Sequence, residues 1–194
     1  RDCVEAGVRA VHSEKPMAPT WGDCLEMDRL AAEAGCQLTF CHQRRFKRGN
    51  LLARELIGQG VFGRIIRMDL YSPKNLLDCG THTFDQALSF NAESPARWVL
   101  GAVDGSEPIR WFDVHAEAMA TGLVVFENGV FAHFNTGVPD LDMGTGVRVI
   151  GEKGFLEIQW DGGFSDARLY DQPDWTPPGV AEEKDDAMID MVRN

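Results

Sequence analysis

The sequence has few basic residues and no long apolar run, and each shortage argues against a class of protein. Its 194 residues include 19 Lys and Arg against 30 Asp and Glu, which gives a formal net charge of −11. Contacts to phosphates need an excess of cations, so we expect no nucleic-acid partner. No apolar stretch is long enough to cross a bilayer and no signal peptide is visible, so we expect no membrane partner.

Paired cysteine motifs are also missing. The five cysteines are odd in number and form no C-x-x-C pair: Cys3, Cys24, Cys36, Cys41 and Cys79. Most of them sit in apolar or helical patterns, where a free thiol behaves as a small hydrophobic side chain. The pattern favours a reducing, cytoplasmic location over a disulfide framework. The histidines, cysteines and acidic residues show no convincing metal spacing, so we predict no metal.

The length suits one large domain or two small ones. The chain begins at Arg1 in the middle of a pattern and ends inside a pattern typical of a helix, so we expect it to be a piece of a longer protein.

A parallel strand–helix–strand unit is predicted first. Gly7 and Gly35 each follow a helix end and precede a short apolar strand. Between them, Thr20 or Asp23 could cap a helix that runs to Ala34. A crossover of this length predicts that the two strands are parallel.

Period-two strands dominate after Gly63, where we place a domain boundary between residues 1–63 and 64–194. A helix over 47–57 precedes the boundary. The pair Asn128–Gly129 predicts a type I′ hairpin, and strands joined by hairpins favour an antiparallel sheet. Strands are expected over 64–71, 97–103, 116–127, 130–134, 147–150, 155–160 and 167–170, then a surface loop over 172–184 and a helix from Asp185.

Three polar residues between the first two of these strands have the spacing of one helix face. Asp78, His82 and Asp85 recur at i, i+4 and i+7. A carboxylate beside a histidine fixes its tautomer and stabilises the imidazolium, so the ring can take up and return a proton near neutral pH. Gly80 would allow close approach of backbone or ligand. The same spacing is also typical of a surface helix with ordinary polar pairs.

Polar motifs follow both strands of the parallel unit. Glu14–Lys15–Pro16 follows the first, and the run from His42 to Arg48 follows the second. Ligands bind beyond the carboxyl ends of such strands. The lysine could bind a substrate oxygen, and the cations could hold an anionic or polyhydroxy ligand. A solvated loop lysine and a solvated helix entry are the alternatives.

These motifs in this order resemble the Gfo/Idh/MocA family of NAD(P)-dependent oxidoreductases. They are E-K-P, R-R-F, the G-x-x-G-x-I from Gly60 to Ile65, and D-x-G-x-H-x-x-D. The resemblance covers nearly the whole chain. It implies an α/β plus α+β fold: the C-terminal part of a Rossmann-like parallel sheet followed by a mostly antiparallel open-sheet domain.

The resemblance implies an oxidoreductase that uses NAD or NADP on a sugar, inositol or related polyol. By position, it assigns catalytic roles to Lys15, Asp78 and His82, with the lysine on the substrate hydroxyl and the histidine as proton acceptor. Asp85 matches a position that supports the same helix. The residues implied in cofactor binding are Glu14, Lys15, Pro16, His42 and Arg45.

The glycine-rich dinucleotide turn of that family lies upstream of E-K-P, and no G-x-G-x-x-G follows an early strand here. We therefore expect the chain to lack the N-terminal half of the Rossmann domain. Two other functions fit the fold: a non-catalytic ligand-binding or regulatory protein, and a nicotinamide-dependent glycosidase relative.

Apolar residues are expected on both faces of the antiparallel sheet. They are Val124, Val125, Phe126, Val130, Phe131 and Phe134. Helices can cover one face only, so we expect a homo-oligomer through the open face.

Overall fold

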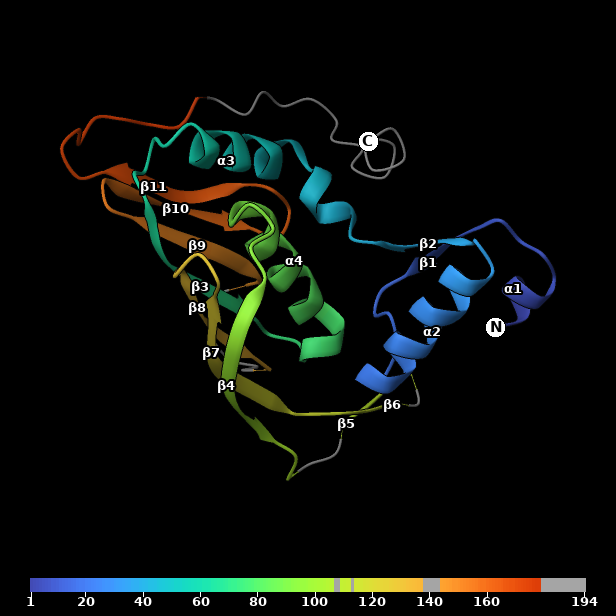
Figure 1. Ribbon diagram of the computed structural model, residues 1–194. Coiled ribbons are helices and arrows are strands. Elements are labelled where there is room, and N and C mark those ends of the chain that lie inside the picture. The colour runs from blue at the N-terminus through green and yellow to red at the C-terminus, as the bar shows by residue number, and fades with distance from the viewer. Residues whose placement is uncertain (107–108, 113, 138–143, 179–194) are drawn as a thin grey trace. The chain divides into compact units, whose positions relative to one another are not determined.

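The computed structural model describes residues 1–106, 109–112, 114–137 and 144–178 (Figure 1). Its contacts divide the chain into two compact units, Arg1–His42 and Gln43–Asn194. The division falls directly after the second strand of the parallel unit.

The first unit has the predicted parallel arrangement. Helix α1 (Asp2–Glu5) precedes β1 (Ala10–Glu14), and α2 (Trp21–Glu33) connects β1 to β2 (Gln37–Cys41). The strands pair in parallel from Ala10 opposite Gln37 to Glu14 opposite Cys41.

Local signals in the sequence explain these boundaries. Gly7 and Gly35 have φ values of 75° and 61°, a conformation that favours glycine at a helix end. Of the two expected caps, Thr20 begins α2, because its hydroxyl accepts a hydrogen bond from the Asp23 amide at 3.1 Å.

The second unit is built on a seven-stranded sheet in the order β11-β10-β9-β3-β8-β7-β4. Neighbouring strands are antiparallel except β3 and β8, which are parallel. This confirms the mostly antiparallel sheet, although no sequence signal identified the parallel pair. The strands are β3 (Ile65–Ser72), β4 (Ala96–Asp104), β7 (Met119–Phe126), β8 (Phe131–Thr136), β9 (Gly146–Gly151), β10 (Gly154–Gln159) and β11 (Phe164–Leu169). A separate hairpin of β5 (Ile109–Trp111) and β6 (Val114–Ala116) was not expected from the sequence.

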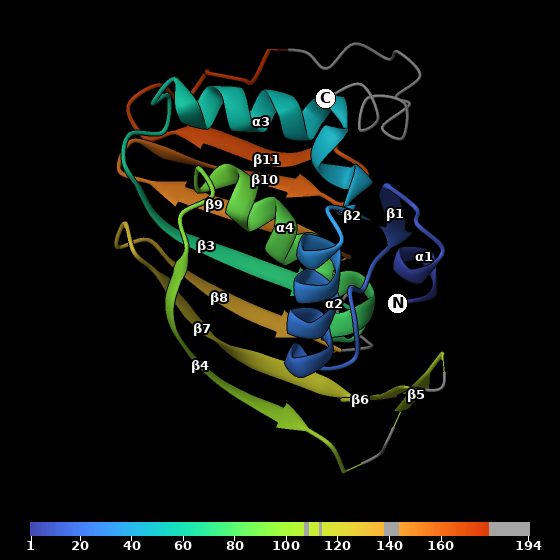
Figure 2. The same cartoon turned by 45° about the vertical axis from the view of Figure 1, so that its right-hand side comes forward.

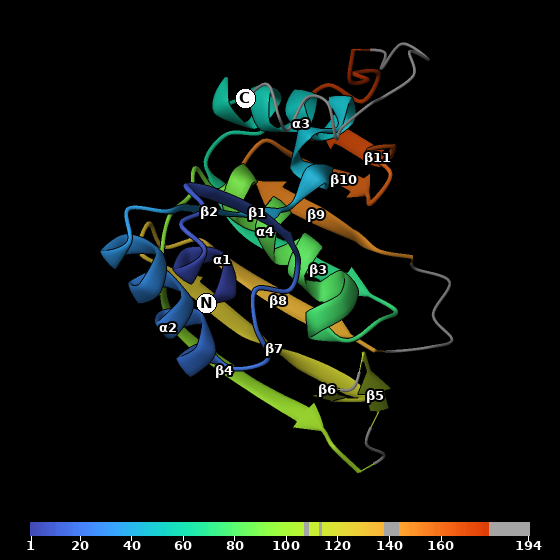
Figure 3. The same ribbon diagram turned by 90° about the vertical axis from the view of Figure 1, so that its right-hand side faces the viewer.

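The helices of the second unit cover one face of this sheet (Figure 2). They are the 3-10 helix η1 (Gln43–Phe46), α3 (Arg48–Gly58), the π-helical turn η2 (Leu76–Gly80) and α4 (Thr81–Phe90). Helix α3 packs on β10, and α4 packs on β3 and β9. Figure 3 shows β11 and β4 at opposite edges of the sheet.

The core lies between this helical layer and the sheet. Met68, Ala132 and Val124 are opposite one another in register on β3, β8 and β7, and all three are buried. Ala53 and Leu56 of α3 belong to the same core. Helix α3 therefore folds with the sheet, whereas the sequence pattern grouped it with residues 1–63.

The hairpin at Asn128–Gly129 forms, but its turn differs from the predicted type. A type I′ turn needs positive φ at both central residues. Gly129 has φ 85°, while Asn128 is not among the residues with positive φ. The Gly129 amide bonds to the Phe126 carbonyl, and the Phe126 amide bonds to the Val130 carbonyl, which is the pattern of a three-residue loop with glycine last. The Asn128 side chain is held instead by Asn91 and the Val130 amide.

The expected loop over 172–184 lies partly outside the described residues, and the helix expected from Asp185 lies wholly outside them. No helix in the described part of the chain is long and apolar enough to cross a membrane. None of the five cysteines forms a disulfide.

Candidate functional site

In the first unit, two sequence-predicted motifs follow neighbouring strands. Glu14 and Cys41 are the last residues of β1 and β2 and are register partners. Lys15 and His42 therefore leave the same edge of the parallel pair, where open α/β sheets bind ligands. The Lys15–Pro16 peptide is cis. Of the expected cofactor-binding residues, this edge contains Glu14, Lys15, Pro16 and His42.

In the second unit, the D-x-G-x-H stretch begins with a π-helical turn. The Gly80 amide bonds to the Asn75 carbonyl at 3.1 Å, which is the i to i+5 hydrogen bond of a π-helix. The buried Asn75 begins this turn by accepting a hydrogen bond from the Asp78 amide at 2.8 Å. The Glu117 carboxylate accepts from the Leu76 amide at 2.6 Å. Such turns are rare and occur frequently at functional sites.

Close packing holds the end of this turn. A Cβ atom on Gly80 would lie 3.3 Å from the Asn75 carbonyl oxygen and 3.4 Å from Thr136 Cγ2. This explains glycine here, as the sequence pattern predicted. Helix α4 begins at the next residue, and His82 lies in its first turn with only 5% of its surface exposed.

The expected single α-helical face is wrong, because a π turn precedes the α-helix. Asp78 lies in the π turn while His82 and Asp85 lie in α4, so the i, i+4, i+7 alignment of one α-helix does not run through all three. The Asp85 carboxylate is bound by Arg45 through both of its oxygens. The pairing of Asp78 with His82 stays a prediction.

Arg45 lies in η1 and joins it to α4. Its Nη2 and Nε atoms bond to the two carboxylate oxygens of Asp85 at 2.6 and 2.9 Å, and Nη1 bonds to Glu93 at 2.9 Å. Burial by itself lowers the pKa of Arg45, but the bonds to Asp85 and Glu93 outweigh it and the pKa is raised. In the structure Arg45 is a structural partner of α4, and its expected contact with a cofactor stays a prediction.

Arg44 belongs to the cationic run from His42 to Arg48, but the sequence pattern assigned it no role of its own. Its guanidinium lies 3.5 Å from the centroid of the Trp160 ring, and Nη1 bonds to the Trp160 carbonyl at 2.8 Å. Burial lowers the pKa of Arg44, and the nearby Cys79 and Asp161 oppose that shift. Because Trp160 is 116 residues further along the chain, no local pattern could have revealed this pair.

Within the described residues, no cluster of three or more His, Cys, Asp or Glu side chains could hold a metal ion. The spacing G-x-G-x-x-G does occur at Gly58, Gly60 and Gly63. It ends α3 and leads into β3, whereas a dinucleotide fingerprint follows a strand and opens a helix. These glycines therefore form no pyrophosphate turn.

No protein-family model matches the chain. Among curated proteins, it is similar to 1-carboxy-3-chloro-3,4-dihydroxycyclohexa-1,5-diene dehydrogenase of Comamonas testosteroni, with 31% identity over 163 residues, 72% of this chain and 40% of that protein. It is also similar to an uncharacterized oxidoreductase of Schizosaccharomyces pombe, with 29% identity over 39% of this chain and 26% of that protein. The chain thus spans well under half the length of these curated relatives.

Several solved structures have the same fold as most of this chain. The aldose-aldose oxidoreductase of Caulobacter crescentus, complexed with glycerol, has a TM-score of 0.74 and 24% identity over 98% of this chain and 62% of that one. The chain has the fold of the Gfo/Idh/MocA oxidoreductases. The WlbA dehydrogenase of Bordetella pertussis, in complex with NADH and UDP-GlcNAcA, has a TM-score of 0.71 and 20% identity over 87% and 58% of the two chains. An inositol dehydrogenase homolog of Azotobacter vinelandii, complexed with NADH and myo-inositol, has a TM-score of 0.69 and 20% identity over 81% and 46%.

Proposed function

We propose that this chain forms the substrate-side part of an oxidoreductase that exchanges a hydride between NAD or NADP and an alcohol or carbonyl of a sugar, inositol or related polyol. The observation that carries the proposal is the position of His82: buried, in the first turn of α4, directly after the π turn that contains Asp78. The Gfo/Idh/MocA fold and the dehydrogenase relatives support it.

The proposed chemistry assigns proton transfer to this chain. His82 accepts the proton of the substrate hydroxyl during oxidation and returns it during reduction, with Asp78 favouring the charged imidazolium. Lys15 orients the same hydroxyl as a hydrogen-bond donor. Arg45 holds α4 through Asp85 and so fixes where His82 is presented.

The residues of the first unit fit one end of a nicotinamide cofactor. The polar edge after β1 and β2 offers Lys15 and His42 at the place where such sheets bind ligands. When bound, the nicotinamide supplies the hydride acceptor or donor. No glycine-rich turn after a strand occurs in the sequence to receive the pyrophosphate. We therefore expect little or no dinucleotide affinity in the 194-residue chain alone.

The test compares this chain with an extended protein that carries a nucleotide-binding half before Arg1. Calorimetric titration of NAD and NADP should show tight binding to the extended protein only. In that protein, His82→Asn should lower turnover on a polyol panel by about 10²–10⁴-fold while cofactor binding is nearly unchanged. Lys15→Ala should weaken both substrate binding and turnover.

The matched control is His115→Asn, because His115 is exposed on β6. It should retain full turnover. Undiminished turnover in His82→Asn, or no turnover on any polyol or sugar, would contradict the proposed function.

We also propose a homo-oligomer through the open sheet face and a cytoplasmic location. Val125, Phe131 and Trp98 are register partners on β7, β8 and β4, and they alternate with the residues that face the helices. Trp98 is 47% exposed and Leu100 68%. A contiguous apolar surface of this kind is typical of an interface, and five cysteines without a disulfide suit a reducing compartment.

Sedimentation at micromolar concentration tests the assembly. The chain should sediment as an oligomer, and Leu100→Lys should shift it toward monomer because a charge would be buried at the interface. The control Gln59→Lys introduces the same charge at an exposed residue at the end of α3, in the helical layer on the other face of the sheet, and should leave the oligomer intact. A monomeric parent chain would refute the proposed oligomer, but it would not bear on the proposed oxidoreductase chemistry.

A further inference from the structure

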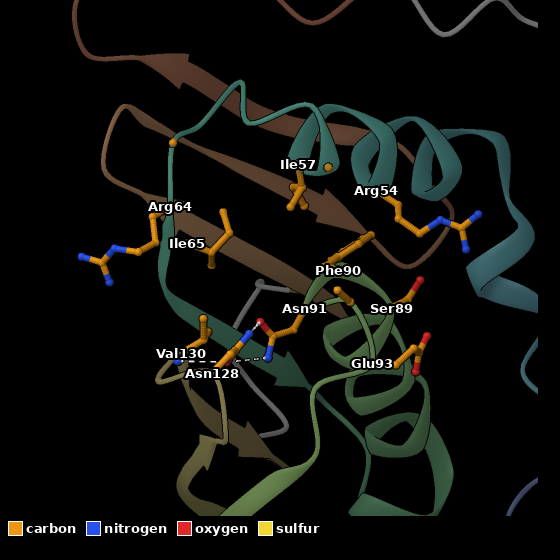
Figure 4. Close-up of a pocket in the computed structure, with 13 residues that line it drawn as sticks. Arg54, Ile57, Arg64, Ile65, Ser89, Phe90, Asn91, Glu93, Asn128 and Val130 are labelled. Atoms are coloured by element: carbon orange, nitrogen blue, oxygen red, sulfur yellow. Dashed lines mark hydrogen bonds between the residues drawn. The ribbon is translucent and has the colours of Figure 1, made fainter.

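A cavity lies in the second unit, at the end of α4 opposite to His82 (Figure 4). Its volume is about 620 Å³, which is in the range of small-molecule sites. It is bounded by the last turns of α3 and α4, the start of β3 and the β7–β8 hairpin. Ser89, which lines it, follows His82 by seven residues, a rise of about 10 Å along a helix.

The floor of this cavity is apolar. Ile57, Ile65 and Phe90 lie between the two arginines that mark its ends, Arg54 and Arg64 (Figure 4). Phe90 is buried and both isoleucines are partly buried around the core. A flat or cyclic apolar body placed there would cover surface that is now open to water.

One end of the cavity carries a hydroxyl that lacks a hydrogen bond. Ser89 is only 5% exposed, yet no group in the described part of the chain bonds to its side chain. The Ser89 oxygen is not among the fully buried side-chain atoms that lack a partner in the described part of the chain. Its hydroxyl is therefore accessible from the cavity that it lines and can donate a hydrogen bond to a ligand there.

The same end carries an available cation. Arg64 at the other end is already paired with Glu152 at 2.8 Å. Glu93, which also lines the cavity, is bound to Arg45 at 2.9 Å. Arg54 has no ion pair or hydrogen bond with any described residue, and it lies on the same side of the cavity as Ser89 (Figure 4). A carboxylate could accept from the Arg54 guanidinium and the Ser89 hydroxyl together.

We infer that this cavity binds a small monocarboxylate with a cyclic apolar body. The ring lies on Ile57, Ile65 and Phe90, and the carboxylate is held by Arg54 and Ser89. The backbone beside this end is fixed in an uncommon conformation, since Ala92 and Glu93 both have positive φ, 52° and 57°. Consecutive residues of this kind without glycine occur at ligand clamps. The site is separate from the proposed catalytic residues and needs none of them.

The 194-residue chain itself is sufficient for the test. Benzoate, benzamide and acetate are titrated into isotope-labelled chain while amide signals are followed by NMR. Benzoate should shift the amide signals of Ser89 and Phe90 saturably. Benzamide lacks the charge and acetate lacks the ring, so each should bind at least about tenfold more weakly.

Three variants complete the test. Arg54→Gln should weaken benzoate binding about tenfold or more, because a charge-assisted bond is lost. Ser89→Ala should weaken it less, because one neutral donor is lost. Arg97→Gln, the same change at an exposed residue of β4 that does not line the cavity, should leave it unaltered. The inference is overturned if benzoate and benzamide bind equally, if Arg54→Gln binds as the parent does, or if neither benzoate nor cyclohexanecarboxylate gives saturable shifts up to its solubility limit.

Discussion

Arg45 and Asp85 form a two-point ion pair, 2.6 and 2.9 Å between donor and acceptor atoms, across 40 residues of sequence. It joins the 3-10 helix that follows β2 to the middle of α4. Both side chains are largely buried, and the second carboxylate on Arg45 comes from Glu93, just after the end of α4. The orientation of α4, and with it His82, therefore depends on a segment that is distant along the chain.

Breaking this pair should destabilise the second unit. Asp85→Asn leaves the Arg45 guanidinium partly buried with only Glu93 as a carboxylate partner, and we expect a loss of about 2 kcal/mol in the free energy of unfolding. Urea denaturation of the chain measures it. The control is Arg168→Gln, whose ion pair with Asp166 is largely exposed on the arginine side. Surface pairs contribute about 0–1 kcal/mol, so equal losses in the two variants would contradict this role for Asp85.

Two glycines of the second unit should respond oppositely to the same substitution. A Cβ atom on Gly122 would lie 2.5 Å from Phe134 Cζ in the core, and closer still to the Leu100 carbonyl oxygen. Gly122→Ala should therefore destabilise the sheet by about 1–3 kcal/mol. Gly58 ends α3 with nothing within 4 Å of the same position. Gly58→Ala should be neutral or stabilising by up to about 1 kcal/mol, because alanine favours helix. Thermal unfolding measures the stability of both variants relative to the parent. A Gly122→Ala chain as stable as the parent would refute the packing argument.

The sequence predicts those parts of the fold that local chemistry determines. Gly7, Gly35 and Thr20 mark helix ends and a helix start through their own backbone and side-chain preferences, and the structure agrees. Asn128–Gly129 located a hairpin correctly but not its turn type, because the Asn128 side chain bonds to Asn91 of a distant helix end.

In the candidate site, too, local sequence determines some features and tertiary packing determines others. The order of the motifs marks Lys15 and His82 as candidate site residues, and their roles stay predictions. The spacing of Asp78, His82 and Asp85 suggested one helix face, because a π turn has no distinct residue period over five residues. The partner of Asp85 could not be predicted either, since Arg45 lies 40 residues earlier and reaches it only through the packing of η1 on α4. The parallel pairing of β3 with β8 is likewise a property of the whole sheet.

Asn75 holds the π turn through two hydrogen bonds. Asn75 is buried, and its side-chain oxygen accepts from the Asp78 amide at 2.8 Å while its carbonyl accepts from the Gly80 amide at 3.1 Å. Asn75→Ala removes the first of these bonds and should cost about 1 kcal/mol of stability, as the loss of other helix caps does. Asn75→Ser retains an acceptor and should recover part of the loss.

The specific readout is local, because a general loss of stability would not single out one turn. Amide hydrogen exchange should accelerate most at Asp78 and Gly80 in Asn75→Ala, and less in Asn75→Ser. Asn135→Ala makes the same chemical change at an exposed position of β8 and should leave exchange at both amides unaltered. In the extended protein, turnover should fall in Asn75→Ala while cofactor binding is unchanged, because the turn places Asp78 beside the start of α4. Unaltered exchange at Asp78 in Asn75→Ala would show that the cap does not hold this turn.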